Sequence, residues 1–256
     1  MTLHVERSGH GPDLVLLHGW GLNGAVWGPL LEALLPHFRL HVVDLPGHGF
    51  SAQQALPANL NAVVARVADV VPARAHWLGW SLGGLIALAA ALTQTNAVTK
   101  LILVGSTPRF VANDDWPHGV PLTTLQQFAA DLHADFPATL RQFLALQSLG
   151  MPNARAVTRD LAAHMLARPA PSAQALSSGL SLLHDSALDN DVPKIKQPLL
   201  VIHGAQDRLV PVSAGEFLAR TAPHGELLRI ERAGHVPFLS HTREIADRIV
   251  EFVHVA

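Results

Sequence analysis

The pentapeptide Gly79-Trp80-Ser81-Leu82-Gly83 places a serine between a strand-like run, residues 75–78, and a helix-like run, residues 84–91. A serine on a tight strand-to-helix turn projects its hydroxyl outward. The turn also brings neighbouring atoms so close together that glycine is needed at the flanking positions. Because G-x-S-x-G alone is common by chance, its context carries the prediction that Ser81 is a nucleophile.

The composition allows a large folded core and excludes several function classes. The chain has 256 residues, of which 49% are hydrophobic and 15% charged, so disorder is not expected. A formal net charge of −2 disfavours a general nucleic-acid or membrane-surface binder. The absence of cysteine rules out a thiolate nucleophile and any cysteine-based metal site.

The apolar runs are too short for a membrane span, since Gly, His or Arg interrupts each of them well before about 20 residues. Residues 1–7 lack the basic region and long apolar stretch of a secretory signal. We therefore expect a cytoplasmic protein.

Short apolar runs alternate with helical patterns along much of the chain. Such alternation predicts an α/β fold with a mostly parallel sheet and helices on both faces. The expected strands are residues 14–17, 40–43, 75–78, 101–104, 199–202 and 227–230. The first expected helix begins near Val26, with Leu30, Leu31, Leu34 and Leu35 buried. The other expected helices cover residues 60–71, 84–91, 213–220 and 242–253.

The alternation stops in the middle of the chain. Residues 116–185 are helix-like throughout and contain no segment typical of a parallel core strand. We interpret them as a helical cap inserted into one α/β core that comprises residues 1–115 and 186–256.

A nucleophilic serine needs a base, and the base is usually a histidine oriented by a buried carboxylate. Among 16 histidines, His235 stands out because it lies in a loop between the last strand and the last helix. Asp207 follows the strand at 199–202, and both loops belong at the same sheet edge as Ser81. We predict a catalytic triad, whose order Ser81, Asp207, His235 is that of α/β-hydrolases. His48, His203, His224 and His241 are interpreted as ordinary loop histidines.

The tetrahedral intermediate of acyl transfer needs N–H donors for its oxyanion. The first predicted donor is the backbone N–H of Leu82, at the start of the helix after Ser81. The second is that of Trp20, in the glycine-flanked segment His18-Gly19-Trp20-Gly21 that follows the first strand.

The patterns for metals and cofactors are weak. No H-E-x-x-H or comparable spacing is present, and we expect no metal and no cofactor. Gly19, Gly21 and Gly24 form G-x-G-x-x-G with Asp44 at a suitable distance, so dinucleotide binding is an alternative. That alternative leaves Ser81, Asp207 and His235 unexplained.

The chain resembles the α/β-hydrolases over its whole length, the details of the cap excepted. Within them it is similar to the pimeloyl-[acyl-carrier protein] methyl ester esterases of biotin synthesis. The segments that carry this similarity are residues 16–23, 43–47, 77–84 and, within the cap, Arg141-Gln142-Phe143-Leu144-Ala145-Leu146-Gln147. The resemblance implies hydrolysis of a pimeloyl methyl ester carried on acyl carrier protein. It also implies that Trp20, Phe143 and Gln147 line the acyl channel.

Acyl carrier proteins are acidic, so a docking surface for them needs basic residues. Between residues 141 and 168 the cap has four arginines, Arg141, Arg155, Arg159 and Arg168, against one acidic residue, Asp160. Arg155 and Arg159 are four residues apart and would share a helix face. We predict docking by Arg141, Arg155 and Arg159. The family has basic residues where this chain has Ala138 and Gln142, and Arg141 stands one residue away.

Three other functions remain compatible with the same motifs. They are a broad short-chain carboxylesterase without a carrier-protein role, a carbon–carbon bond hydrolase, and a hydrolase-fold receptor with little turnover. No nucleic-acid or membrane partner is expected, and we expect a monomer.

Overall fold

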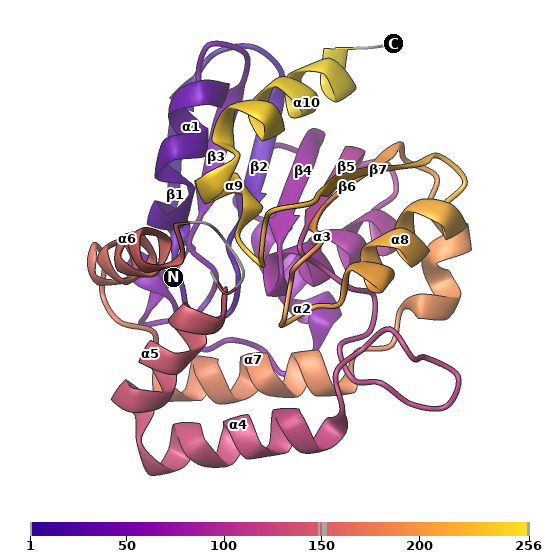
Figure 1. Cartoon of the computed structure of the whole chain (residues 1–256). Helices are drawn as coiled ribbons and strands as arrows, with labels where there is room; N and C mark the ends of the chain where they lie inside the picture. Colours follow the sequence, from indigo (N-terminus) through magenta and orange to yellow (C-terminus); the bar gives the residue numbers. More distant parts are fainter. Residues whose placement is uncertain (1, 148, 150–152, 255–256) are drawn as a thin grey trace.

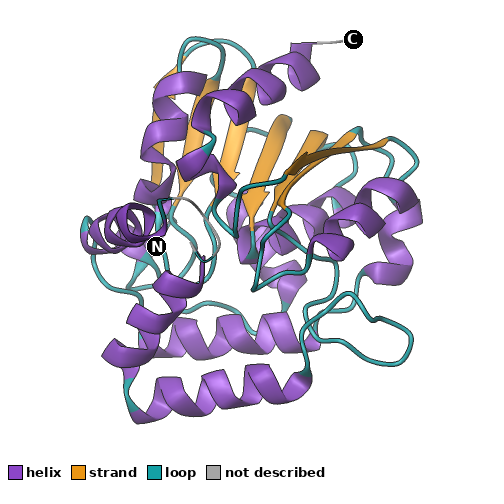
Figure 2. Cartoon of the chain, viewed as in Figure 1, coloured by secondary structure: helices purple, strands orange, loops and turns teal. Residues whose placement is uncertain are grey.

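The computed structural model describes residues 2–147, 149 and 153–254. At its centre lies a seven-stranded sheet in the order β1-β3-β2-β4-β5-β6-β7 (Figure 2). Only β1 is antiparallel to its neighbour in this sheet; the other pairs are parallel. The strands are β1 Val5–Gly9, β2 Asp13–Leu17, β3 Arg39–Val43, β4 Ala75–Trp80, β5 Val98–Val104, β6 Leu199–Gly204 and β7 Gly225–Ile230.

Alternate residues of the central strands enter two different cores, one on each face of the sheet. Val15 and Leu17 of β2 point to one core, whereas Leu14 and Leu16 point to the other. All four side chains are fully buried. This burial on both sides explains why the parallel strands read as continuous apolar runs.

Helices cover both faces, which confirms the predicted fold class. On the first face lie α2 Leu60–Ala68, α3 Leu82–Thr93 and α8 Val212–Thr221. On the second lie α1 Gly28–Leu34 and α10 Thr242–His254, which pack against each other. Three short 3₁₀ segments (Gly24–Trp27, Gly49–Ser51 and Asp189–Lys194) and the short helix α9 Pro237–Ser240 complete the core.

Between β5 and β6, the described residues form four successive α-helices. They are α4 Leu122–Ala134, α5 Phe136–Gln147, α6 Ala154–Leu166 and α7 Ala173–Asp185. Figure 1 shows α4 and α7 side by side across one end of the sheet, with α5 and α6 continuing to one side. Buried side chains of α7, such as Leu176 and Leu183, join the core that contains α3. The helices therefore lie over the sheet edge from which Ser81 projects.

The six strands predicted from apolar runs are all present, and β1 is the one that the sequence pattern missed. Most of β1 is exposed, so it has no apolar run, and it is a strand because it pairs with β3. The first helix also begins later than expected: Val26 lies in a 3₁₀ turn and α1 starts at Gly28. Leu35, which we expected to be buried, is 39% exposed and lies just after the last residue of α1.

The start of the inserted region is a loop rather than a helix. Residues 116–121 precede α4, and Trp116 is buried against Phe217 of α8, with ring centroids 4.8 Å apart. The helical segment thus begins at Leu122. The division into core and cap domains at residues 115 and 186 stays a prediction.

None of the helices in the described part of the chain combines the length and the apolar character that crossing a membrane requires.

Candidate active site

Ser81 lies at the turn between β4 and α3 with φ +54° and ψ −119°. It is the one non-glycine residue with positive φ among those the structure describes. Such a conformation costs about 1–3 kcal/mol and persists only where the surroundings hold it. Here Ser81 N–H donates to the carbonyl oxygen of Val104 at 3.0 Å, and the Ser106 hydroxyl donates to the Ser81 carbonyl oxygen at 3.0 Å.

The glycines on either side of Ser81 are required by close backbone contacts. A Cβ on Gly79 would lie 2.3 Å from the carbonyl oxygen of Gly83. A Cβ on Gly83 would lie 2.2 Å from the carbonyl oxygen of Leu17. The turn is therefore pressed against the end of β2, as the G-x-S-x-G pattern predicts.

Asp207 and His235, 28 residues apart, are brought into direct contact. Nδ1 of His235 lies 2.8 Å from Oδ2 of Asp207, and both residues are almost fully buried. The other carboxylate oxygen, Oδ1, accepts the backbone N–H groups of Leu209 at 2.8 Å and Val210 at 2.9 Å. This arrangement fixes the carboxylate against the imidazole and leaves Nε2 of His235 as the nitrogen that could act as a base.

The electrostatics favour an ionised Asp207. Burial raises the pKa of this carboxyl group, but interactions with His235 and His203 outweigh it and bring the pKa below its ordinary value. Asp207 is therefore a carboxylate at neutral pH and can stabilise a positive charge on His235.

The main chain of His235 is held from two further directions. Its N–H donates to the carbonyl oxygen of Gln147, at the end of α5, at 3.0 Å. Its carbonyl oxygen accepts the Nε1–H of Trp80, the residue before Ser81, at 2.9 Å. The histidine loop is thus tied both to the serine turn and to the inserted helices.

Ser81 and His235 line the same cavity, which has a volume of about 230 Å³. Its walls are mostly apolar and come from the loop after β2, from α4, α5 and α7, and from neighbouring loops. The ring of Trp20 meets the rings of Phe128 and Phe143 edge-on, with centroids 5.3 and 5.1 Å away. Trp20 and Phe143, two of the three predicted substrate contacts, therefore lie on this wall.

Gln147, the third predicted contact, is not among the residues that line this cavity. Its side chain is fully buried, and neither its amide oxygen nor its amide nitrogen has a hydrogen-bond partner among the described residues. Unpaired buried amides are costly and are therefore rare in native proteins.

The two predicted oxyanion donors lie beside Ser81. Leu82 is the first residue of α3, so its N–H has no acceptor within the helix. On the other side, a Cβ on Gly19 would lie 3.2 Å from Cβ of Ser81, which places the segment of Trp20 against the serine. The indole Nε1–H of Trp20 is engaged elsewhere, since it donates to the carbonyl oxygen of Leu176 in α7 at 2.9 Å. The oxyanion role of both N–H groups stays a prediction.

The predicted docking arginines have different surroundings. Arg155 and Arg159 are both exposed on α6, and Nε of Arg159 lies 3.7 Å from a carboxylate oxygen of Asp160. The side chain of Arg141 lies outside the part of the chain that the structure describes. Arg168 does not belong to an exposed basic surface, because its side chain is 6% exposed and its guanidinium pairs with Glu6 and Asp44.

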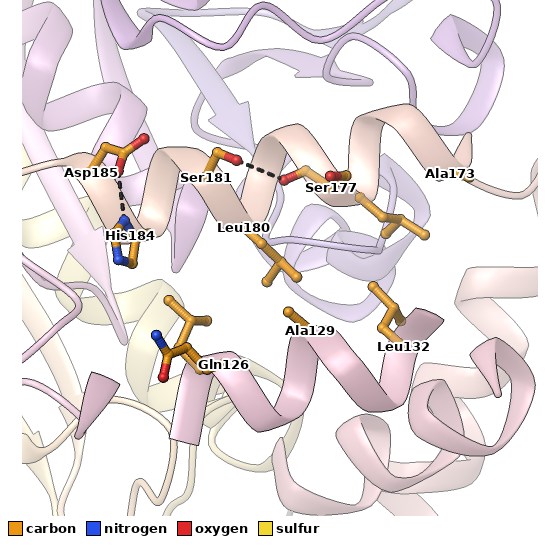
Figure 3. Close-up of a pocket in the computed structure, with 11 residues that line it drawn as sticks. Gln126, Ala129, Leu132, Ala173, Ser177, Leu180, Ser181, His184 and Asp185 are labelled. Atoms are coloured by element: carbon orange, nitrogen blue, oxygen red, sulfur yellow. Dashed lines mark hydrogen bonds and ion pairs between the residues drawn. The ribbon is translucent and has the colours of Figure 1, made fainter. Parts of the chain in front are cut away.

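A second cavity, of about 530 Å³, lies between α4 and α7 (Figure 3). Leu180 of α7 and Ala129 and Leu132 of α4 point into it, and Gln126, Ser181 and His184 lie nearer one end. Leu125 and Leu180 line both this cavity and the one that contains Ser81. The two cavities thus share a wall.

The alternative of a dinucleotide site does not fit the glycine-rich segment. Asp44 is fully buried, and its carboxylate accepts the N–H groups of Gly24 at 2.7 Å and Phe50 at 2.8 Å. It is therefore enclosed by the protein and not open to a ribose. Among the described residues, no group of three or more His, Asp or Glu side chains could hold a metal ion.

The sequence interpretation missed His203, which is a buried neighbour of Asp207 and not a surface loop residue. Its Nε2 lies 3.4 Å from Oδ2 of Asp207. The position of His203 near the end of β6, four residues before Asp207, is the signal that could have indicated this contact. His48 was also misjudged: it is fully buried, with its ring 5.2 Å from that of His18.

Comparison with known proteins agrees with this fold. The pattern described as the alpha/beta hydrolase fold matches residues 12–242. The chain belongs to the α/β-hydrolase family. A relative from Xanthomonas campestris pv. campestris (strain B100), named pimeloyl-[acyl-carrier protein] methyl ester esterase, is 47% identical over 98% of both chains. A relative of the same name from Stenotrophomonas maltophilia (strain K279a) is 44% identical over 98% of this chain and 96% of its own.

Solved structures of this α/β-hydrolase family superpose on nearly the whole chain. An esterase from Exiguobacterium antarcticum has a TM-score of 0.87 and 26% identity, covering 99% of this chain and 96% of its own. A bromoperoxidase from Bacillus anthracis has a TM-score of 0.89 at 21% identity, covering 99% and 95%, and supports the fold alone.

Proposed function

We propose that this α/β-hydrolase is a serine carboxylesterase that hydrolyses the methyl ester of a pimeloyl group carried on acyl carrier protein. The observation that carries the proposal is the shared cavity of Ser81 and His235, with Asp207 bonded to the far side of the imidazole. Full-length relatives with 44–47% identity that are named for this reaction support the choice of ester.

In the first half of the reaction, Nε2 of His235 takes the proton of the Ser81 hydroxyl as its oxygen attacks the ester carbonyl. Asp207 holds the imidazole through Nδ1–H and stabilises the positive charge that develops on it. The imidazolium then protonates the departing methoxide, so that methanol leaves and an acyl-serine remains.

In the second half, the same histidine activates a water that attacks the acyl-serine. Collapse of the second tetrahedral intermediate releases the acid and restores Ser81. In both halves the backbone N–H groups of Leu82 and Trp20 are proposed to stabilise the oxyanion, each contributing on the order of 3 kcal/mol.

The cavity suits a flexible aliphatic acyl chain. Its lining is mostly apolar, and the edge-on cluster of Trp20, Phe128 and Phe143 forms one wall. We propose Trp20 and Phe143 as acyl contacts. Gln147, four residues after Phe143 on α5, is proposed as a further polar contact, supported by its buried amide, whose N–H and C=O lack partners in the described part of the chain.

We propose that the acidic carrier protein docks on the exposed face of α6, through Arg155 and Arg159. Their separation of four residues places both guanidinium groups on one side of the helix. Arginine suits carboxylate and phosphate partners because its planar fork donates two parallel hydrogen bonds. Arg141 of α5 is proposed as a third docking residue on the basis of its sequence position alone.

The decisive experiment compares kcat/KM for methyl pimeloyl-acyl carrier protein with kcat/KM for free dimethyl pimelate and 4-nitrophenyl acetate, using the full chain. We expect a clear preference for the carrier-bound ester. Equal values for carrier-bound and free esters would instead support a broad carboxylesterase without a carrier-protein role.

Ser81→Ala is the control for the mechanism, because it removes only the nucleophilic oxygen. We expect it to lower kcat by about 10⁴-fold or more on every ester. Near-full activity in this variant would contradict a serine esterase altogether.

A further inference from the structure

His203 occupies an enclosed position beside Asp207, at the second-last residue of β6. Its Nε2 lies 3.0 Å from the carbonyl oxygen of Val210 and 3.4 Å from Oδ2 of Asp207. A carbonyl oxygen can only accept, so Nε2 carries a proton and donates it to Val210. We infer that His203 is a positioning residue for Asp207, and through Asp207 for the His235 base.

Val210 connects His203 to the carboxylate. The N–H of Val210 donates to Oδ1 of Asp207, and the carbonyl oxygen of Val210 accepts from His203. Both main-chain polar groups of Val210 are thus engaged, the N–H with the carboxylate of Asp207 and the carbonyl oxygen with the imidazole of His203. Without the His203 donor, the carbonyl of Val210 would be buried and unpaired, and the loop that carries Asp207 would lose its anchor to the strand.

Two imidazoles face the same oxygen of Asp207, His235 at 2.8 Å and His203 at 3.4 Å. The shorter contact is a hydrogen bond, whereas the longer one is beyond ordinary hydrogen-bond distance and acts as an electrostatic contact. Burial raises the pKa of Asp207, whereas His235 lowers it most strongly and His203 lowers it further, so that the pKa lies below its ordinary value. His203 therefore favours the ionised carboxylate in the orientation that His235 needs.

The surroundings of Nδ1, the other ring nitrogen of His203, indicate that this side chain does more than fill space in the core. Nδ1 of His203 is buried and has no hydrogen-bond partner among the described residues. Gly215 of α8 closes over it, since a Cβ there would lie 2.5 Å from Nδ1. An apolar side chain of similar size would avoid the cost of an unpaired buried nitrogen, so the donor at Nε2 is what distinguishes histidine here.

The role assigned to His203 rests on the proposed ester hydrolysis, because it acts through the same carboxylate. It is tested with His203→Met and His203→Gln, two unbranched side chains of similar size of which only Gln has an N–H donor. The substrate is 4-nitrophenyl acetate, so that carrier docking plays no part. We expect His203→Met to lower kcat about 10- to 100-fold with KM changed less than about twofold, and His203→Gln to stay within about threefold of the wild type.

A double-mutant cycle with Asp207→Asn separates positioning from general damage to the fold. If His203 acts through the carboxylate, His203→Met has almost no further effect once Asp207 is Asn. The same fold-loss in both backgrounds, or a His203→Met enzyme as fast as the wild type, would overturn the inference. Should His203→Met not fold, His203→Gln decides alone, since a kcat loss of more than about 30-fold in that variant also overturns it.

Failure of the proposed ester hydrolysis and failure of the role of His203 give different kinetic results. A wild-type protein that turns over neither 4-nitrophenyl acetate nor the carrier-bound ester would refute the proposed esterase. An active wild type that is slowed by Asp207→Asn but not by His203→Met would refute only the role of His203.

Discussion

Nη1 of Arg168 lies 2.9 Å from Oδ1 of Asp44, and the two side chains are 6% and 0% exposed. Arg168 follows α6 in the inserted region, whereas Asp44 follows β3 in the core. The same guanidinium contacts Glu6 of β1 through Nη2 at 2.7 Å. A buried ion pair therefore connects the inserted helices to the core, at a residue that the sequence pattern grouped with exposed arginines.

We predict that Arg168→Met destabilises the protein, because it leaves the carboxylate of Asp44 buried without its cation. The expected loss in the free energy of unfolding is about 3 kcal/mol. Urea unfolding at neutral pH measures it, with Arg159→Met as the matched control, since the Arg159 side chain is 78% exposed. The control should change stability by less than about 0.5 kcal/mol. Equal stability of the two variants would contradict the assigned role of the pair.

We predict that the buried imidazole of His48 makes the folded protein less stable at acidic pH. Burial, and next the neighbouring His18, lower the pKa of His48 to about 3. Below about pH 6.5, the ordinary pKa of histidine, the unfolded chain binds a proton that the folded protein does not accept until about pH 3. The folded state therefore loses stability as pH falls through this window, at up to about 1.4 kcal/mol per pH unit from this residue.

Urea unfolding of the wild type and His48→Leu at pH 7 and pH 4.5 tests this effect. Leu cannot take up a proton in the unfolded state, so the variant should show the smaller loss of stability between the two pH values. Buried Asp44 and Asp207 have lowered pKa values in both proteins and lose their contribution only at lower pH, below the ordinary pKa of Asp. Identical pH dependence in the two proteins would show that His48 is not held neutral.

The third prediction tests docking on α6. We expect Arg155→Glu combined with Arg159→Glu to raise KM for the carrier-bound ester about tenfold or more, because two attractive charges become repulsive. The kinetics on 4-nitrophenyl acetate should not change, since neither residue lines the Ser81 cavity.

The matched control is Arg66→Glu combined with Arg74→Glu, which changes net charge equally at exposed positions outside α6. This control should leave KM for the carrier-bound ester within about twofold of the wild type at physiological salt. The same increase in KM for both double variants would indicate a general charge effect and argue against α6 as the docking face.

The fourth prediction tests the packing of the serine turn. Gly83→Ala would place a Cβ 2.2 Å from the carbonyl oxygen of Leu17, so Ser81 or the end of β2 must move. We expect a loss of about 2 kcal/mol in stability and a loss of most esterase activity. Gly28→Ala is the control, because the nearest atom to its Cβ would be 3.6 Å away. Wild-type activity in Gly83→Ala would mean that the turn tolerates displacement.

The local sequence predicted those parts of the fold that local patterns encode. Strands β2 to β6 can be recognised as apolar runs because most of their residues are buried, and the glycines around Ser81 indicate the turn that they make possible. Asp207 and His235 could be selected because each follows a strand, and parallel strands end at one sheet edge. Local patterns do not encode β1, which exists only because β3 pairs with it.

The sequence by itself thus determined the α/β-hydrolase fold, the serine turn and the order of the proposed triad residues. Only the tertiary structure decided that Arg168 is a buried link to Asp44, that Trp20 is anchored to α7, and that His203 faces the carboxylate of Asp207. The first two relations join segments that are far apart in the sequence, whose proximity no spacing along the chain reveals, and the third depends on how the loop after β6 folds back onto the strand. Whether an arginine is a docking group or an internal ion pair, and whether a histidine is exposed or buried, depends on what folds against it.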